Sequence, residues 1–182
     1  MSESAATLEI NPCSSSKSPE AVHHPQAQGI AHFAVYGQPH PTSAVSSRRI
    51  LSTDWETEPF IAPVTCPWNL SLTPAQISKL ILGFEPVEME DKWFVFADGP
   101  DEGGGVRVNF FRSWTGNKIF EVRVELEGLV VQGKKDGREG RIKELVYESN
   151  EEVVAEQDEE GAKEMVAELC KWVLGIELEG EE

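Results

Sequence analysis

The 182-residue sequence predicts an α+β fold: a four-stranded antiparallel sheet with an N-terminal and a C-terminal helix packed on one face. Two observations lead to this prediction. Short segments rich in β-branched and aromatic residues alternate apolar with polar positions, as antiparallel strands do when one face is buried. One segment with apolar residues at helical spacing precedes these strands, and another follows them.

The composition restricts the classes of partner. The chain has 32 acidic and 16 basic residues, for a formal net charge of -16. A field of this sign repels phosphate backbones and anionic membranes, so we expect neither nucleic-acid binding nor membrane binding. No segment reaches the roughly 18 uninterrupted apolar residues of a membrane-spanning helix, and the first residues lack a secretory-signal pattern. We therefore expect an intracellular, cytoplasmic protein.

The cysteines and histidines do not indicate a metal site or a disulfide framework. Cys13, Cys66 and Cys170 are scattered and odd in number. All four histidines fall within the first 47 residues, without Cys or carboxylate partners at suitable spacing. We expect no metal and no cofactor.

Two segments precede the predicted domain. Residues 1–47 are rich in Ser, Ala, Pro, His and Gln without a sustained apolar period, which predicts a disordered tail. Its exception is the run 30–36, Ile-Ala-His-Phe-Ala-Val-Tyr, which we interpret as a strand or a partner-binding segment. Residues 48–70 mix aromatic and apolar residues with prolines. This predicts an extended arm across a hydrophobic surface, because proline-rich backbone pairs poorly within a sheet.

The folded domain is predicted to span residues 71–175, followed by an acidic tail at 176–182. Its first helix begins after Thr73, which caps it, with Pro74 at the first helical position and Gln76 completing a capping box. The apolar face of this helix consists of Ile77, Leu80, Ile81 and Phe84. The second helix is predicted from about residue 160 to residue 174.

Four strands are predicted between the helices, at residues 92–97, 106–111, 120–126 and 142–149. In the two middle strands the apolar positions alternate with polar ones, so we expect one buried face and one wet face. The wet face is expected to form cross-strand ion pairs among Arg107, Glu121, Arg123 and Glu125. Residues 132–141 are predicted to be a flexible, locally basic hairpin loop.

The turn between the two middle strands, Arg-Ser-Trp-Thr-Gly-Asn at residues 112–117, is the candidate functional site. An arginine can bind a phosphate or carboxylate through two nitrogens, tryptophans offer stacking faces, and hydroxyl and amide groups donate hydrogen bonds. The candidate ligand-binding residues are Trp93, Arg112, Ser113, Trp114, Thr115 and Asn117. A structural explanation stands beside this one, since Gly116 and Asn117 supply the positive φ of a tight hairpin.

Catalysis by this turn lacks a base. Ser113 or Thr115 needs a neighbouring base to act as a nucleophile, yet every histidine lies in the predicted tail. A carboxylate pair drawn from Asp98, Asp101 and Glu102 is a weaker alternative, since acids in a glycine-rich loop are usually solvated. The residue types therefore favour binding over catalysis.

Three segments together resemble a small uncharacterised domain found in bacteria and fungi. They are Lys-Trp-Phe-Val at 92–95, the run 111–120 around Arg-Ser-Trp-Thr-Gly, and Asn150 followed by an acidic linker and an amphipathic helix. The resemblance covers about residues 86–175. Relatives often have His before the arginine, where this chain has Phe111, so the resemblance implies no acid–base role there. It implies a loose association with ADP-ribose or nucleotide-processing proteins.

Two functional hypotheses follow. The first is a non-enzymatic binding or adaptor module that uses the turn at 112–117, with the N-terminal arm, to hold a protein or a small anionic ligand. The alternative is a nucleotide- or ADP-ribose-related enzyme or accessory subunit.

Overall fold

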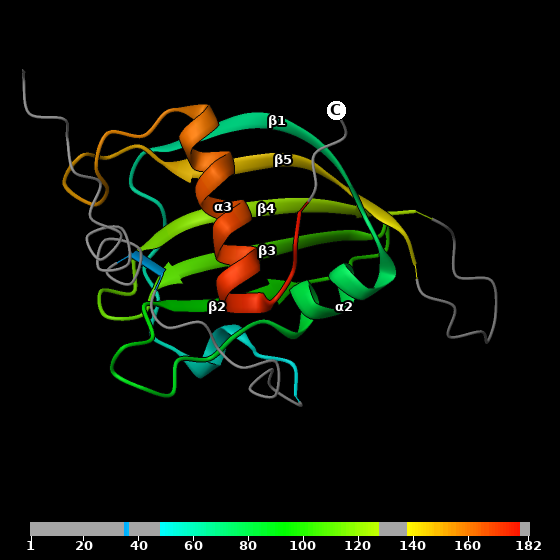
Figure 1. Ribbon diagram of the computed structural model, residues 1–182, viewed down its shortest axis with the longest axis horizontal. Helices are drawn as coiled ribbons and strands as arrows, with labels where there is room; N and C mark the ends of the chain where they lie inside the picture. Colours follow the sequence, from blue (N-terminus) through cyan, green and yellow to red (C-terminus); the bar gives the residue numbers. More distant parts are fainter. Residues whose placement is uncertain (1–34, 37–47, 128–137, 179–182) are drawn as a thin grey trace, which may run out of the picture.

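The protein is an α+β domain built on a five-stranded antiparallel sheet with strand order β1-β5-β4-β3-β2 (Figure 1). The computed structural model describes residues 35–36, 48–127 and 138–178. The strands are β1 (Pro63–Leu72), β2 (Trp93–Asp98), β3 (Gly105–Arg112), β4 (Lys118–Leu126) and β5 (Gly140–Glu148). The helices are α2 (Pro74–Leu82), α3 (Glu159–Leu174) and the short 3-10 helix η2 (Ser52–Asp54).

The predicted α+β class with an antiparallel sheet is confirmed, but the predicted strand number of four is wrong. The additional strand is β1, predicted as part of the extended arm at 48–70, and it pairs with β5 at one edge of the sheet. The prolines do not prevent this. Pro63 is the first residue of the strand, and the register shifts between Pro67 and Leu70. An edge strand uses only half of its amides, so proline costs little there.

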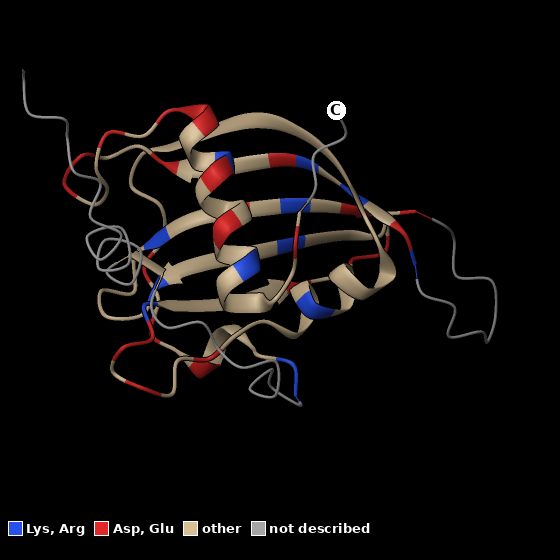
Figure 2. Cartoon of the chain, in the orientation of Figure 1, with Lys and Arg blue, Asp and Glu red and all other residues tan. Residues whose placement is uncertain are grey.

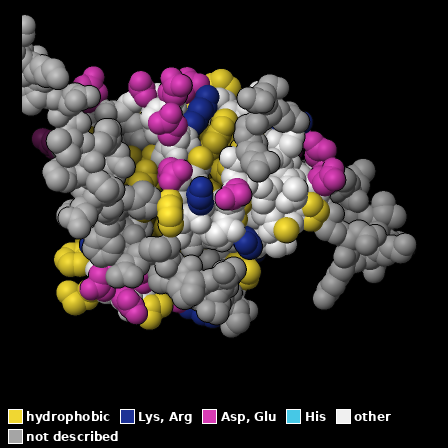
Figure 3. Space-filling view, in the orientation of Figure 1, with side chains coloured by type: hydrophobic (Ala, Val, Ile, Leu, Met, Phe, Trp, Pro, Cys, Tyr) yellow, Lys and Arg dark blue, Asp and Glu magenta, His cyan; other side chains and the backbone are white. Residues whose placement is uncertain are grey.

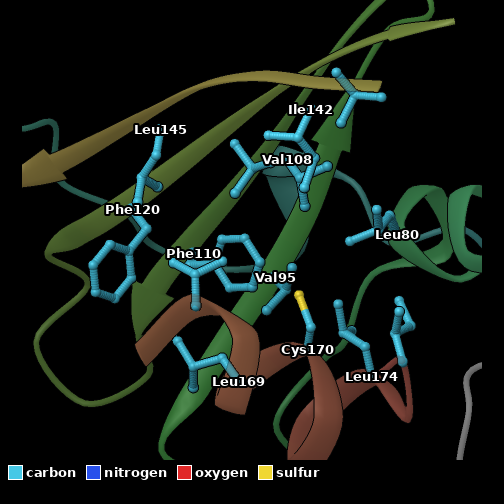
Figure 4. Packing of buried hydrophobic residues seen from close by; sticks show 14 of the residues in the cluster. Leu80, Val95, Val108, Phe110, Phe120, Ile142, Leu145, Leu169, Cys170 and Leu174 are labelled. Atoms are coloured by element: carbon cyan, nitrogen blue, oxygen red, sulfur yellow. The ribbon is translucent and has the colours of Figure 1, made fainter. Parts of the chain in front are cut away.

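The main core lies between the sheet and α3, which crosses one face of the sheet (Figure 1). Leu169 and Cys170 of α3 lie near Phe110 and Val95 of the sheet (Figure 4). The predicted helix at 160–174 is confirmed to within one residue. Its buried residues recur at helical spacing and are Ala162, Val166, Leu169, Cys170, Val173 and Leu174.

The capping signals predicted for the first helix are all present. The Thr73 side chain accepts from the Gln76 amide at 3.4 Å, and the Gln76 side chain accepts from the Thr73 amide at 2.7 Å. The helix ends at Gly83, where φ is 77° and a Cβ would stand 2.3 Å from the Val95 carbonyl oxygen. Only glycine fits this position, which places α2 beside the β2 edge.

The prediction of a wet second face is wrong at the β2 edge. Phe94, Phe96 and Phe111 form a second buried cluster there with Ile50, and Trp55 packs against it. All four residues from Trp93 to Phe96 are buried, so this part of β2 has apolar side chains on both faces. The arm from residue 48 to residue 62 therefore covers a hydrophobic surface, as the sequence predicted for this part of the arm.

The predicted cross-strand ion pairs among Arg107, Glu121, Arg123 and Glu125 are not formed, because the one ion pair between these four described residues, Arg123 with Glu121, lies within β4. Arg123 contacts Glu121 at 3.0 Å and Glu144 at 2.8 Å, and Lys143 lies 3.6 Å from Glu125. Arg107 stands opposite Arg123 in the strand register rather than opposite an acid. The exposed pairs, Arg123 with Glu144 and Lys143 with Glu125, contribute little to stability.

The predicted acidic tail begins with a buried residue. Ile176 is 2% exposed and its amide donates to the Cys170 carbonyl at 2.8 Å, after Gly175 turns the chain with a φ of 62°. Acidic residues are concentrated in the connector before α3 and in the loop before β2 (Figure 2). In the described ranges, no helix has the length and apolar character needed to cross a membrane. The predictions for residues 1–34, 37–47, 128–137 and 179–182 fall outside the described residues.

Candidate functional site

The turn between β3 and β4 is closed by backbone hydrogen bonds. The Gly116 amide donates to the Arg112 carbonyl at 2.8 Å, and the Arg112 amide donates to the Asn117 carbonyl at 3.0 Å. Gly116 has a φ of 71°, a conformation that favours glycine. The prediction that Gly116 supplies a positive φ in this turn is therefore confirmed.

The arm that precedes β1 holds this turn in place. The Glu58 amide donates to the Gly116 carbonyl at 2.8 Å, and the Lys118 amide donates to the Glu58 carbonyl at 3.1 Å. A Cβ at position 116 would stand 2.8 Å from the Glu56 carbonyl oxygen. The arm thus anchors the turn through backbone contacts between residues about sixty positions apart in sequence.

Five of the six candidate residues separate into two groups. Arg112 stands opposite Trp93 in the β2–β3 register, and Arg112 lines a pocket with the connector and α3. Ser113, Trp114 and Thr115 line a different pocket with the arm. We call these two regions the Arg112 side and the Trp114 side.

Trp93 is completely buried on the Arg112 side. Its ring stacks on Phe120 with a centroid distance of 6.2 Å, and the Arg112 guanidinium carbon lies 4.3 Å from the ring centroid. The ring therefore has no free face on which a ligand can stack. Its indole N–H is nevertheless used, because it donates to the Val35 carbonyl at 2.9 Å.

Arg112 donates to the same carbonyl, from Nη1 to the Val35 oxygen at 3.0 Å. Among the described residues, no carboxylate forms an ion pair with its guanidinium. Loss of water around the group lowers its pKa, and the nearby Tyr36 hydroxyl partly opposes this shift. The arginine is thus a desolvated cation whose acceptor is a neutral backbone carbonyl.

A pocket of about 590 Å³ opens beside Arg112. The β-sheet contributes Arg112 and Ile119 to its wall, α3 contributes Gly161 and Met165, and the connector 153–158 forms the rest with Val35. Two carboxylates, those of Glu156 and Asp158, are also in this lining. The Asp158 side chain is engaged as the cap of α3, since it accepts from the Gly161 amide at 2.8 Å.

Two residues of this site were not among the candidates, Val35 and Tyr36. Both are helical and half-buried, so the interpretation of 30–36 as a strand is wrong for these two residues, and the rest of the run lies outside the described residues. Tyr36 packs against the main core. Its burial, and to a smaller extent the nearby Glu168 carboxylate, raises the pKa of its hydroxyl. The signal in the sequence was the apolar run itself, which does not specify the surface it contacts.

Ser113 is a buried structural residue. It is 7% exposed, its hydroxyl donates to the Asp91 carbonyl at 2.6 Å, and its amide donates to the Lys92 carbonyl at 3.0 Å. No histidine lies within the described ranges, so nothing there can serve as an imidazole base for it.

Asp98 and Asp101, two of the three acids considered for a carboxylate pair, have structural partners. Asp101 accepts from the amides of Gly103 and Gly105, at 2.9 and 2.7 Å, and Asp98 accepts from the Asn109 side chain at 3.3 Å. These contacts shape the loop between β2 and β3.

Trp114 has the opposite environment to Trp93. It is 67% exposed, its indole N–H donates to the Met89 carbonyl at 3.2 Å, and the Lys92 ammonium lies 5.2 Å from its ring centroid. Thr115 is exposed and accepts from the Asn117 amide at 3.4 Å, while Asn117 forms an isolated bridge with Glu58. The adjoining pocket has a volume of about 440 Å³.

Within the part of the chain that the structure describes, no three or more His, Cys, Asp or Glu side chains are grouped so as to hold a metal ion. Comparison of the chain with protein-family models, curated proteins and solved structures gives no match. Function must therefore be argued from the geometry of the two sides of the turn.

Proposed function

We propose that this chain is a non-enzymatic binding module whose Arg112 side holds a segment of a partner protein by a backbone carbonyl. The observation that carries the proposal is the convergence of two side-chain donors, from Trp93 and Arg112, on the single carbonyl of Val35. Val35 lies outside the sheet and helices that form the core, 28 residues before β1 begins at Pro63. Val35 and Tyr36 therefore act as an internal ligand of this site.

The donors select the type of group that can bind. An indole and a guanidinium are donors only, so any ligand must offer an acceptor at this point. Burial of a cation without an anionic partner is unfavourable, and a hydrogen bond to a charged donor contributes about 1.5–3 kcal/mol. A carbonyl acceptor therefore offsets part of the cost of desolvating Arg112.

The internal ligand offers two contacts. The Val35 carbonyl accepts from both the Trp93 indole and the Arg112 guanidinium. Tyr36 adds an aromatic contact with the main core. We infer that a partner segment with an apolar residue followed by an aromatic one competes with Val35 and Tyr36 for the site.

A peptide with the sequence of residues 30–40 tests this proposal. A fluorescein-labelled form is titrated into the full-length protein, and fluorescence anisotropy reports binding. Tyr36→Ala weakens the internal ligand, so the peptide binds this variant at least about tenfold more tightly than wild type. Adding Arg112→Ala to Tyr36→Ala weakens the peptide again by about tenfold, because the charged donor is lost.

Trp114→Ala provides the matched control, because it removes an aromatic side chain from the other side of the same turn. This control leaves the peptide affinity unchanged. Arg112→Lys keeps the charge with a different donor geometry, and it serves if Arg112→Ala fails to fold. Equal affinities for the Arg112 variants and the Trp114 control would refute the proposal.

A small anionic ligand is the second candidate, because Arg112 lines the pocket of about 590 Å³ without a carboxylate ion pair among the described residues. The carboxylates of Glu156 and Asp158 in the same lining repel anions, so we rank it second. A thermal-shift series with inorganic phosphate, AMP and ADP-ribose separates the two. Stabilisation by one of these that Arg112→Ala abolishes favours the anion, and no stabilisation favours the peptide.

A further inference from the structure

We propose that the Trp114 side is a docking surface for a partner segment that presents a lysine or arginine beside an apolar side chain. The surface consists of the exposed apolar residues Val87, Met89 and Trp114 and the carboxylates of Glu56 and Glu58. This inference does not depend on the peptide site at Arg112. The two surfaces share a turn but no lining residue.

The apolar part of the surface is unusually accessible. Val87 is 85% exposed, Met89 74% and Trp114 67%, and these are three of the six exposed large hydrophobic residues in the described part of the chain. The hydrogen bond from the Trp114 indole to the Met89 carbonyl places Trp114 beside Met89, and Val87 lies two residues earlier in the same loop. Figure 3 has the orientation of Figure 1. At the position of the loop before β2, it shows hydrophobic side chains beside acidic ones. Exposed apolar groups rimmed by polar residues are typical of interaction sites.

Buried polar contacts hold this exposed surface in shape. The Asp91 side chain accepts from the amides of Val87 and Glu88, at 2.8 and 2.9 Å, and Asp91 is only 4% exposed. The Asp91 carbonyl in turn accepts from the buried Ser113 hydroxyl at 2.6 Å. The loop and the turn are thus joined beneath the surface, so docking orders few new groups.

The surface already accommodates one cation. The Lys92 ammonium lies 5.2 Å from the centroid of the Trp114 ring, within the range of a cation–π contact. Since Lys92 belongs to the domain itself, it competes with any cation that a partner brings to this ring.

The charges around Trp114 complement a basic partner. Glu56 and Glu58 line the pocket of about 440 Å³ together with Asp54, Trp55 and Trp114. Glu88 and Glu90 are exposed on the neighbouring loop. None of these four glutamates forms an ion pair with a described residue. Two indoles and uncompensated carboxylates favour a lysine or arginine side chain and repel an acidic one.

Fluorescence anisotropy with a defined probe tests this inference on the full-length protein. The probe is a fluorescein-labelled peptide, Gly-Ser-Leu-Lys-Leu-Ser-Gly, and its control carries Nε-acetyl-lysine at the central position. We expect saturable binding with a Kd below about 1 mM at low ionic strength, and at least about fivefold weaker binding of the acetylated control. Trp114→Ala should weaken the lysine peptide by about tenfold, and Lys92→Ala should strengthen it by about threefold.

A pair of charge variants separates a local effect from the net charge. Glu56→Gln with Glu58→Gln removes two carboxylates from the pocket, whereas Glu151→Gln with Glu152→Gln removes two exposed carboxylates from the connector. Only the first pair should weaken the peptide, by about fivefold. No saturable binding, equal binding of the acetylated control, no loss in Trp114→Ala, or equal losses in both charge pairs would each overturn the inference.

Discussion

The two sides of the β3–β4 turn use the same residue types in opposite environments. On the Arg112 side, Trp93 is 0% exposed and its cation is the desolvated Arg112. On the Trp114 side, the indole is 67% exposed and its cation is Lys92, at the longer distance of 5.2 Å from the ring centroid. In both, the indole N–H donates to a backbone carbonyl, that of Val35 or that of Met89.

This difference shows how burial changes the role of an indole–cation pair. When the pair is buried, its donors are committed to one acceptor, and the pair contributes to stability and to selection of a carbonyl. When the pair is exposed, the ring face remains accessible and contributes little to folding. Unfolding free energies and hydrogen exchange distinguish the two environments.

The largest effect is expected from truncation of the two indoles. Trp93→Ala removes a completely buried side chain from the main core and should lower the free energy of unfolding by about 4 kcal/mol. Trp114→Ala should change it by about 0.5 kcal/mol or less, because the ring is mostly solvated. Urea denaturation followed by circular dichroism measures both. Similar losses in the two variants would remove the contrast.

Acid should weaken the arm that supports the Trp114 side. Glu148 is buried and accepts from the amides of Ile61, Ala62, Ser149 and Asn150. Burial alone would raise its pKa, but the four hydrogen bonds outweigh burial and lower it. The carboxylate therefore stabilises the fold above the usual glutamate pKa of about 4.3, and this contribution is lost as pH falls through the lower folded pKa.

Glu148→Gln checks this account. The substitution should cost about 2 kcal/mol at pH 7, because an amide cannot accept all four hydrogen bonds. It should also flatten the fall of stability below about pH 4.3. Urea midpoints of both proteins are measured from pH 3 to pH 7. If the stability of the variant falls below about pH 4.3 as steeply as that of wild type, the assigned role of Glu148 is wrong.

The fit between the arm and the turn is tested at Gly116. An alanine there would need a φ near 71° and would place its Cβ 2.8 Å from the Glu56 carbonyl oxygen. Gly116→Ala should therefore cost about 2 kcal/mol. Gly103→Ala serves as a control, since its added Cβ meets only the Asp101 side chain at 3.4 Å. Equal decreases of the denaturant midpoint in Gly116→Ala and Gly103→Ala would show that the arm does not pack tightly against the turn.

A smaller effect is expected at Ser113, which joins the loop before β2 to the turn beneath the Trp114 side. Ser113→Ala leaves the Asp91 carbonyl without its hydroxyl donor and should cost about 1 kcal/mol. Thr115→Ala is the matched control, because Thr115 is exposed and makes only a 3.4 Å contact. Thermal unfolding should place Ser113→Ala below Thr115→Ala, and the reverse order would argue against a buried link.

The elements that depend on near neighbours in sequence were predictable. The capping box of α2 requires only Thr73, Pro74 and Gln76, and the hairpin of β3 and β4 requires only an alternating pattern around a turn. These signals are local, so sequence alone specifies them. The Arg112 and Trp93 side chains are adjacent because β2 and β3 pair in the simple register of a hairpin.

The elements that depend on distant contacts were not predictable in the same way. The strand β1 pairs with β5, about 80 residues later, and its prolines argue for an arm when no partner is known. The second apolar cluster requires Ile50 and Trp55 to contact Phe94, about 40 residues later in the sequence. The contact of Val35 with Arg112 spans 77 residues, and the apolar run at 30–36 indicates only that some surface receives it.

Hydrogen exchange of the indole N–H groups tests the central claim, that Val35 and Tyr36 occupy the Arg112 side as an internal ligand. Nuclear magnetic resonance resolves these groups in the full-length protein. In wild type, the Trp93 indole should exchange slowly and the Trp114 indole rapidly. Tyr36→Ala should accelerate exchange at Trp93 by at least about tenfold and leave Trp114 unchanged. Equally slow exchange of the Trp93 indole in wild type and in Tyr36→Ala would contradict the claim.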